Sequence, residues 1–343
     1  MRHVVHRRGG DDTRRMADTL LLTGSDGYVG SRLAQRLGRY VEVIGISHRG
    51  THGVACELLD EAALDEVART VSPRWIVHAA GNKNIGACEQ QPLVAYDTNV
   101  RTAANVLRAW PDVPMLYLST DYIFDGKQGR YRETSAVNPS TTYGKSKLCA
   151  EVTGALTASG RFTAVRVSAI YDAAGAFLSF LDGELREGRT VDCFSDSYYS
   201  PTYIDDLADG LLALMALERR PEVIHIAGTR TSRFEFARMF ADAFGYDPSL
   251  VRPVTLEHTN APLFPDLSLS THVAVDTLGY RPTAHETALR QIARGVPHAD
   301  AHAIPTILRF EGSHARGDQR RPVGGDQLPR NRRVLHAWGT LSS

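Results

Sequence analysis

Tyr143 and Lys147 are the residues whose types and spacing point most directly to chemistry. They are four positions apart, so a helix places them on one face. An ammonium group beside a phenol lowers the phenol pKa, which allows the tyrosine to transfer a proton near neutral pH. Thr120 follows the strand-like run 115–118 and can bring a hydroxyl to the same place. These three residues form the predicted catalytic group, although a tyrosine and a lysine at this spacing often occur by chance, so the surrounding elements must decide.

A glycine-rich turn near the start of the chain predicts a dinucleotide site. The apolar run 19–23 precedes the turn, and a helical segment, 31–37, follows it. The first glycine permits a tight turn, the second lets a pyrophosphate approach the backbone, and the third lets the helix pack on the strand. The predicted cofactor contacts in this turn are Gly24, Gly27, Tyr28, Val29 and Gly30.

The second strand-like run, 41–46, ends in Ser47, His48 and Arg49. An acidic residue that would accept a hydrogen bond from a ribose 2′-hydroxyl is missing there. A hydroxyl and a guanidinium suit a 2′-phosphate instead, so NADP(H) is the preferred cofactor and NAD(H) stays open. In the alternative interpretation, Arg49 is a solvated loop residue.

Strands and helices continue to alternate after this point. The helix 61–70 precedes the strand 75–78, and small side chains follow in a turn that leaves room for a cofactor. This alternation predicts an α/β fold with a doubly wound parallel sheet. The other expected cofactor contacts are Glu57, Leu58, Ala79, Ala80, Gly81, Asn99 and Ser168, together with Tyr143 and Lys147.

Two blocks, Ser119–Gly126 and Pro139–Leu148, resemble the extended short-chain dehydrogenase/reductase family, and in particular its dTDP-4-dehydrorhamnose reductase branch. The segments 166–171 and 200–208 extend the resemblance, which covers roughly residues 18 to 295. It implies a Rossmann-type domain with a smaller C-terminal substrate lobe. It also implies an NAD(P)-dependent reductase of a nucleotide-activated 4-keto-6-deoxysugar, with Tyr143 as general acid. The residues expected at the substrate are Lys83, Asp121, Tyr122, Phe124, Tyr199 and Thr202.

Departures from the family pattern leave alternatives open. Tyr28 and Val29 stand where reductases of this branch commonly carry glutamine and leucine, and Lys83 lies in a loop similar to that of sugar-nucleotide dehydratases and epimerases. An epimerase or a dehydratase with the same site is therefore the first alternative. Tyr122 stands where common 4,6-dehydratases have a glutamate, which argues against dehydration. The second alternative is a catalytically silent, nucleotide-binding regulatory subunit, which would have no need for the predicted catalytic group.

The expected organisation has four parts. Residues 1–15 are a disordered or misassigned leader, 16–171 form the Rossmann domain, 172–295 form the substrate lobe with a strand near 222–228 returning to the sheet, and 296–343 form a disordered tail. The apolar run 211–217 is too short for a bilayer, which needs about 20 residues, so it predicts a buried helix. An amphipathic helix is expected at 234–244, with its apolar stripe in the core.

Composition excludes several other classes of function. The 39 basic residues equal the 39 acidic residues, so no overall field favours nucleic acid or an anionic membrane. The four cysteines have no metal-ligand spacing, and no metal is expected. A reduced, cytoplasmic protein is predicted, with a nucleotide-sugar substrate as its partner and a homodimer as an open assembly state.

Overall fold

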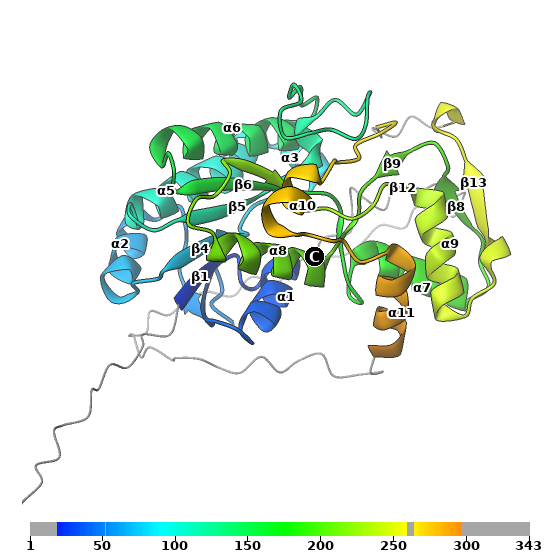
Figure 1. The fold of residues 1–343 in the computed structure, drawn as a ribbon, viewed down its shortest axis with the longest axis horizontal. Helices are drawn as coiled ribbons and strands as arrows, with labels where there is room; N and C mark the ends of the chain where they lie inside the picture. The colour runs from blue at the N-terminus through cyan, green and yellow to red at the C-terminus, as the bar shows by residue number, and fades with distance from the viewer. Residues whose placement is uncertain (1–18, 52, 259–263, 296–343) are drawn as a thin grey trace, which may run out of the picture.

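The computed structural model describes residues 19–51, 53–258 and 264–295 (Figure 1). The predictions for 1–15 and 296–343 lie outside the described residues. At its centre is a seven-stranded sheet with the order β11-β6-β5-β4-β1-β2-β3, in which all pairings are parallel. The strands are β1 (Thr19–Thr23), β2 (Glu42–Ser47), β3 (Val54–Ala55), β4 (Trp75–His78), β5 (Met115–Thr120), β6 (Phe162–Val167) and β11 (Val223–His225).

The strand order confirms the prediction of a doubly wound α/β fold. The chain moves outward from β1 to β3 and then crosses back to β4 on the other side of β1. Cofactors in such sheets bind outside the carboxyl ends of the strands, at the point where the order reverses. That point lies between β1 and β4.

Helices cover both faces of the sheet because alternate strand residues point to opposite faces. In β1, Leu20 and Leu22 belong to one hydrophobic core and Leu21 to the other. The first core includes residues of α1 (Tyr28–Leu37), α8 (Ile204–Ala216) and α10 (His272–Leu278). The second includes residues of α2 (Glu61–Thr70), α5 (Thr102–Ala109) and α6 (Thr142–Thr157), while α3 (Ile85–Gln90), α4 (Pro92–Tyr96) and a π-helical turn (Asp97–Arg101) lead into α5.

The smaller lobe lies at one end of the molecule, beyond the carboxyl ends of the central strands (Figure 1). Its main elements are β8 (Val191–Phe194), paired with β13 (Val251–Val254), and the helices α7 (Ala176–Arg186), α9 (Arg233–Phe244) and α11 (His285–Gly295). Two short pairs connect it to the sheet: β7 (Ile170–Tyr171) with β10 (Thr202–Tyr203), and β9 (Tyr198–Tyr199) with β12 (Thr231–Ser232). Phe236 and Phe240 of α9 are buried, which confirms the core interpretation of its stripe.

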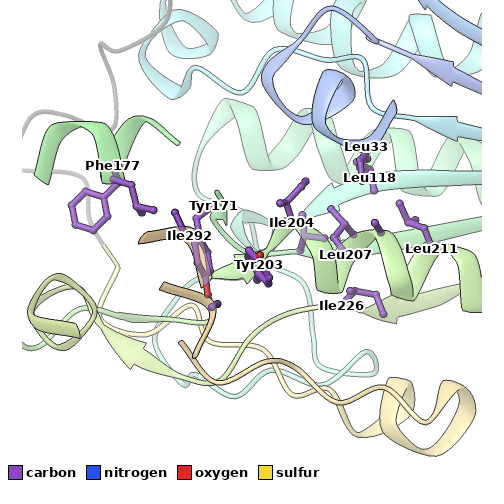
Figure 2. Packing of buried hydrophobic residues seen from close by; sticks show 14 of the residues in the cluster. Leu33, Leu118, Tyr171, Phe177, Tyr203, Ile204, Leu207, Leu211, Ile226 and Ile292 are labelled. Carbon is purple, nitrogen blue, oxygen red and sulfur yellow. The ribbon is translucent and has the colours of Figure 1, made fainter. Parts of the chain in front are cut away.

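One hydrophobic core connects the sheet with the smaller lobe. Figure 2 shows Leu33 and Leu118 near the sheet, then Leu207 of α8, and then Tyr171 and Phe177 further toward the lobe. Within the range 172–295, α8 packs on α1, and α10 packs on α8 and β11. The boundary at residue 171 stays a prediction. Helices α8 and α10 lie within the range predicted for the substrate lobe, yet they pack against elements of the sheet domain. Among the described residues, no helix has the length and apolarity needed to cross a membrane.

Candidate active site

The predicted catalytic residues meet at the carboxyl end of β5. Thr120 is the last residue of β5, and Tyr143 lies in the first turn of α6. Both line a cavity of about 210 Å³ between the sheet and the smaller lobe. Lys147 lies one turn further along α6, is 5% exposed and is not among the residues that line the cavity.

The start of α6 is fixed by two caps and a glycine. The Thr141 hydroxyl accepts a hydrogen bond from the Gly144 amide at 3.0 Å, and Glu89 of α3 accepts from both the amide and the hydroxyl of Thr142. A Cβ on Gly144 would lie 2.1 Å from the carbonyl oxygen of Tyr122. Only glycine therefore lets α6 approach the end of β5 this closely, which brings Tyr143 to Thr120.

The interaction of the Thr120 hydroxyl with the phenol of Tyr143 by itself lowers the pKa of Tyr143. Burial has the larger effect and raises the pKa of Tyr143 above its usual value. The expectation that Lys147 makes this phenol more acidic is therefore wrong for the structure described. The Lys147 amine instead donates to the Leu118 carbonyl at 2.6 Å and lies 3.9 Å from the ring centre of Tyr117.

Lys147 has an electrostatic environment of its own. Burial lowers its pKa to about 7, and the carboxylate of Glu151, one turn along α6, opposes this shift. Glu151 is itself buried, accepts a hydrogen bond from Ser119 and pairs with Arg166 of β6 at 2.7 Å. This network fixes α6 on β5 and β6 and holds the Lys147 side chain at the end of the sheet.

Asp121 adds a buried carboxyl group to the cavity. Ser168 donates to its Oδ2 at 2.6 Å, and Thr120 donates to its Oδ1 at 3.2 Å. Burial raises the pKa of Asp121 to about 6, although these bonds and the charge of Arg233 oppose the shift. A carboxyl with this pKa can accept or donate a proton near neutral pH.

Four of the six residues expected at the substrate line the cavity: Lys83, Asp121, Tyr122 and Tyr199. The structure does not bring Phe124 and Thr202 there. The ring of Phe124 is fully buried and stacks on Tyr131 at 4.2 Å. The Thr202 hydroxyl is also buried, where it accepts from the Ser168 amide and donates to the Ile226 carbonyl. Both residues support the site from within the core, so their prediction as substrate contacts is wrong.

The glycine turn after β1 has the geometry that a dinucleotide needs. Gly24 has φ +70°, and a Cβ there would lie 2.8 Å from backbone atoms of Ala80. A Cβ on Gly30 would lie 2.1 Å from the Gly24 carbonyl oxygen. Gly27 caps α1 and is exposed, so the positive end of that helix is open to a phosphate. These residues fit a phosphate-bearing cofactor, and the neighbouring Tyr28 and Val29 line the cavity.

A comparison with known protein families identifies the chain. The model described as the RmlD substrate binding domain matches residues 18–296. The chain belongs to this family. It is an NAD(P)-dependent oxidoreductase of the extended short-chain dehydrogenase/reductase type, as the motifs around Thr120 and Tyr143 predicted.

The relatives of this RmlD-family chain include both reductases and a subunit of another enzyme. A dTDP-4-dehydrorhamnose reductase of Mycobacterium tuberculosis (strain CDC 1551 / Oshkosh) is 31% identical over 252 residues, 70% of this chain and 80% of the relative. Methionine adenosyltransferase 2 subunit beta of Xenopus laevis is 28% identical over 73% of this chain and 79% of its own length. The crystal structure of a dTDP-4-dehydrorhamnose reductase from Bacillus anthracis in complex with NADP has a TM-score of 0.74 at 23% identity, covering 82% of this chain and all of that one.

Around the end of β2, this family member differs from the sequence-based expectation. The Ser47 hydroxyl donates to the Asp26 carboxylate at 2.6 Å and accepts from the Gly50 amide at 2.9 Å. His48 pairs with Glu57 at 2.8 Å, and Arg49 is exposed. Asp26 of the glycine turn thus places a carboxylate at the end of β2, where the strand itself has none. The absence of an acid in the strand is therefore weaker support for a 2′-phosphate than the sequence indicated.

Two other residues expected to contact the cofactor, Asn99 and Leu58, interact with other parts of the protein in the structure. Asn99 accepts from the Asn82 amide at 2.7 Å and donates to the Asn82 carbonyl and to Ser146. It thereby fixes the turn that contains Gly81, where a Cβ would lie 2.7 Å from the Asn99 oxygen. Leu58 is buried in the core. Their contact with a cofactor, and that of Glu57, Ala79 and Ala80, stays a prediction.

Many residues that line the cavity were not predicted from the sequence, and two of them, a cation and an aromatic ring, bear directly on ligand binding. Arg233 is the first residue of α9, and Phe264 packs edge-on against Tyr122 with 5.4 Å between ring centres. A cation in the first turn of a helix is unfavourable because of the helix dipole, so Arg233 was a possible indication of a binding site in the sequence. The apolar stripe of the same helix led instead to its interpretation as a core helix. Phe264 has no local signal, because only folding brings it to Tyr122.

Proposed function

We propose that this chain uses NADPH to reduce the ring carbonyl of a nucleotide-activated 4-keto-6-deoxysugar. The observation that carries the proposal is the pair of hydroxyls, Thr120 and Tyr143, on the wall of one cavity at the carboxyl ends of the strands. A pair of hydroxyl donors suits a carbonyl oxygen that becomes an alkoxide. The M. tuberculosis relative, which bears the name of such a reductase, supports the choice of substrate class.

Each residue has a defined role in the proposed reaction. The bound nicotinamide supplies the hydride. Tyr143 donates its phenolic proton to the developing alkoxide, and the Thr120 hydroxyl turns from Asp121 to donate a second hydrogen bond to the same oxygen. Lys147 would hold the nicotinamide ribose, while Gly24, Gly27 and the first turn of α1 would hold the pyrophosphate. Asp121, hydrogen-bonded to Thr120, positions the sugar.

NADPH is proposed over NADH because Arg49 is exposed beside the end of β2 and offers a guanidinium to a 2′-phosphate. The B. anthracis structure was determined with NADP, which agrees with this choice. The Asp26 carboxylate beside Ser47 acts in the opposite direction, so the preference rests on the balance of these two charges. A cytoplasmic location and a homodimer stay predictions.

One observation favours a second candidate function, epimerisation or dehydration with the hydride returned to the sugar. The buried Asp121 has a pKa of about 6 and could act as an additional acid or base. Stoichiometric consumption of NADPH distinguishes reduction from both of these reactions. The third candidate is the catalytically silent regulatory subunit, and the relative named as a methionine adenosyltransferase subunit is the reason to test it. A silent protein would turn over no sugar nucleotide.

The deciding experiment mixes the full chain with NADPH and a panel of dTDP-, UDP- and GDP-linked 4-keto-6-deoxysugars and records nicotinamide absorbance. Product analysis by mass spectrometry must show a gain of two hydrogens per NADPH oxidised. The Tyr143→Phe variant serves as the control for contaminating reductases. Product isomers formed without loss of absorbance would instead support the epimerase, and no conversion of any substrate would contradict both enzymes.

A further inference from the structure

We propose that Arg233 and Tyr199 form an anion subsite for the diphosphate of the nucleotide-sugar substrate. This inference deepens the proposed function and rests on it for the identity of the ligand. The two residues belong to the smaller lobe and line the same cavity as Thr120 and Tyr143. The guanidinium carbon of Arg233 lies 5.0 Å from the centre of the Tyr199 ring.

The backbone around Arg233 is held rigidly. Ser232 caps α9 by accepting from the Glu235 amide at 3.1 Å, and the Glu235 carboxylate accepts from the Ser232 amide at 2.8 Å. The Arg233 amide donates to the Ser197 carbonyl at 3.3 Å. These bonds fix the position from which the Arg233 side chain reaches the cavity, so a ligand there meets a preorganised cation.

Arg233 places a largely buried cation on the wall of the cavity. The residue is 8% exposed, and a buried cation loses hydration. It also stands at the positive end of a helix, where the dipole disfavours a cation and favours an anion. A phosphate bound at this point would interact favourably with the guanidinium.

Tyr199 supplies an independent sign of a ligand. Its hydroxyl is buried and has no hydrogen-bond partner within the parts of the chain that the structure describes. Strand β9 pairs with β12 so that Tyr199 lies opposite Thr231, two residues before Arg233. The pairing therefore holds the phenol and the guanidinium near one another. A phosphate oxygen would accept the hydrogen bond that the phenol lacks.

The charges of the cavity match this occupant. Among the described residues that line it, Lys83, Asp121 and Arg233 are the ones with charged side chains. Two of these are cations, and burial raises the pKa of the one acid. In the proposed substrate the 4-keto-6-deoxysugar is neutral, and the diphosphate carries the negative charge. A cationic subsite in this cavity is therefore assigned to the diphosphate, and the planar fork of arginine suits phosphate oxygens.

The test measures binding by calorimetry to the full chain saturated with NADP⁺, which prevents nucleotides from occupying the cofactor site. dTDP, UDP and GDP are each compared with their own nucleoside. For the nucleoside diphosphate that the wild-type protein binds, Arg233→Met should lower affinity at least about tenfold and leave nucleoside binding unchanged. Arg233→Lys keeps the charge without the fork and should lose less. Arg238→Met is the matched control, because Arg238 is on the same helix but is exposed and does not line the cavity.

Tyr199→Phe provides a second, independent readout. It removes a buried hydroxyl without a partner, so the thermal midpoint of the unliganded protein should rise while affinity for the diphosphate falls. Unchanged diphosphate affinity in Arg233→Met and Tyr199→Phe would overturn the subsite, as would equal losses for diphosphate and nucleoside. So would a wild-type protein that binds none of the three diphosphates. If the subsite is confirmed but no keto sugar oxidises NADPH, the proposed reaction fails and the binding site stands.

Discussion

At the scale of single residues, the chemistry depends on which hydroxyl gives up a proton. Replacing Tyr143 by phenylalanine removes the proposed proton donor and keeps the ring that packs against Tyr122. Turnover with the keto sugar should fall by at least ~10²-fold, as expected for loss of one general acid. Cofactor affinity, measured by quenching of protein fluorescence, should stay within about twofold. Tyr96→Phe, at an exposed position of α4, is the matched control, and wild-type turnover in Tyr143→Phe would contradict the assignment.

The raised pKa of Asp121 has a consequence for stability. Its folded pKa of about 6 lies above the ordinary value of 3.8, so the folded state holds the proton more tightly than the unfolded state. The contribution of this group to stability is therefore complete below pH 3.8 and is lost as pH rises through 6. The upper limit of the loss is about 3 kcal/mol for this shift.

Asp121→Asn should remove that pH dependence, because the amide does not ionise. Urea unfolding of the wild type and the variant between pH 4.5 and 8 gives the comparison. The free energy of unfolding of the variant relative to the wild type should increase as pH rises and level off above about pH 7. A difference that is the same at every pH would show that Asp121 is ionised throughout, with its pKa unshifted.

Cofactor choice is a second residue-scale question, because Arg49 and Asp26 have opposite charges near the end of β2. Arg49→Glu should weaken binding of NADPH and leave NADH no weaker. Asp26→Asn should strengthen NADPH binding, since the carboxylate that repels a 2′-phosphate is gone. Dissociation constants for both cofactors in both variants test the pair. Parallel changes for NADPH and NADH would show that these residues affect the adenosine site in general and do not read the 2′-position.

At the scale of secondary structure elements, α6 depends on a glycine. Gly144→Ala would place a methyl group 2.1 Å from the Tyr122 carbonyl oxygen, so α6 must move away from β5. Tyr143 would move with it, away from Thr120. We expect a lower thermal midpoint and a fall in turnover greater than the fall in cofactor affinity. Gly183→Ala in α7 is the control, because a Cβ there meets no atom within 4 Å.

The elements themselves were largely predictable from the sequence, because continuous apolar runs and helix caps are local signals. The strand 75–78 and the helix 61–70 have the predicted bounds, and the latter starts at an Asp60 side chain that caps it. Residues that enter the site through tertiary proximity were not predictable. Asp26 reaches Ser47 across 21 positions of sequence, and Phe264 reaches Tyr122 from the smaller lobe. The pKa of Tyr143 was predicted in the wrong direction because burial cannot be read from a spacing of four residues.

At the scale of the whole molecule, one carboxylate joins the cofactor helix to the smaller lobe. Asp172 follows β7 and is 4% exposed. It accepts from the Tyr28 hydroxyl at 2.8 Å and from the Arg32 guanidinium at 2.8 Å, both on α1. Tyr28 also lines the cavity, so this one side chain contacts both the cavity and Asp172. The bonds of Asp172 should therefore couple the stability of the lobe to occupation of the cofactor site.

Asp172→Asn tests this coupling. The variant keeps the shape of the side chain but loses the charge that Arg32 faces, so we expect a loss of about 1–3 kcal/mol in the free energy of unfolding. Hydrogen exchange in α7 should become faster, and added cofactor should slow it less than in the wild type. Asp205→Asn is the matched control, because Asp205 of α8 pairs with Arg36 on the same helix α1 but its side chain is 47% exposed. Exposed pairs contribute little, so this variant should lose less stability and leave exchange in α7 unchanged. Equal effects of the two substitutions on stability and on exchange in α7 would show that both ion pairs of α1 contribute alike. Asp172 would then have no special part in joining the lobe to the cofactor helix.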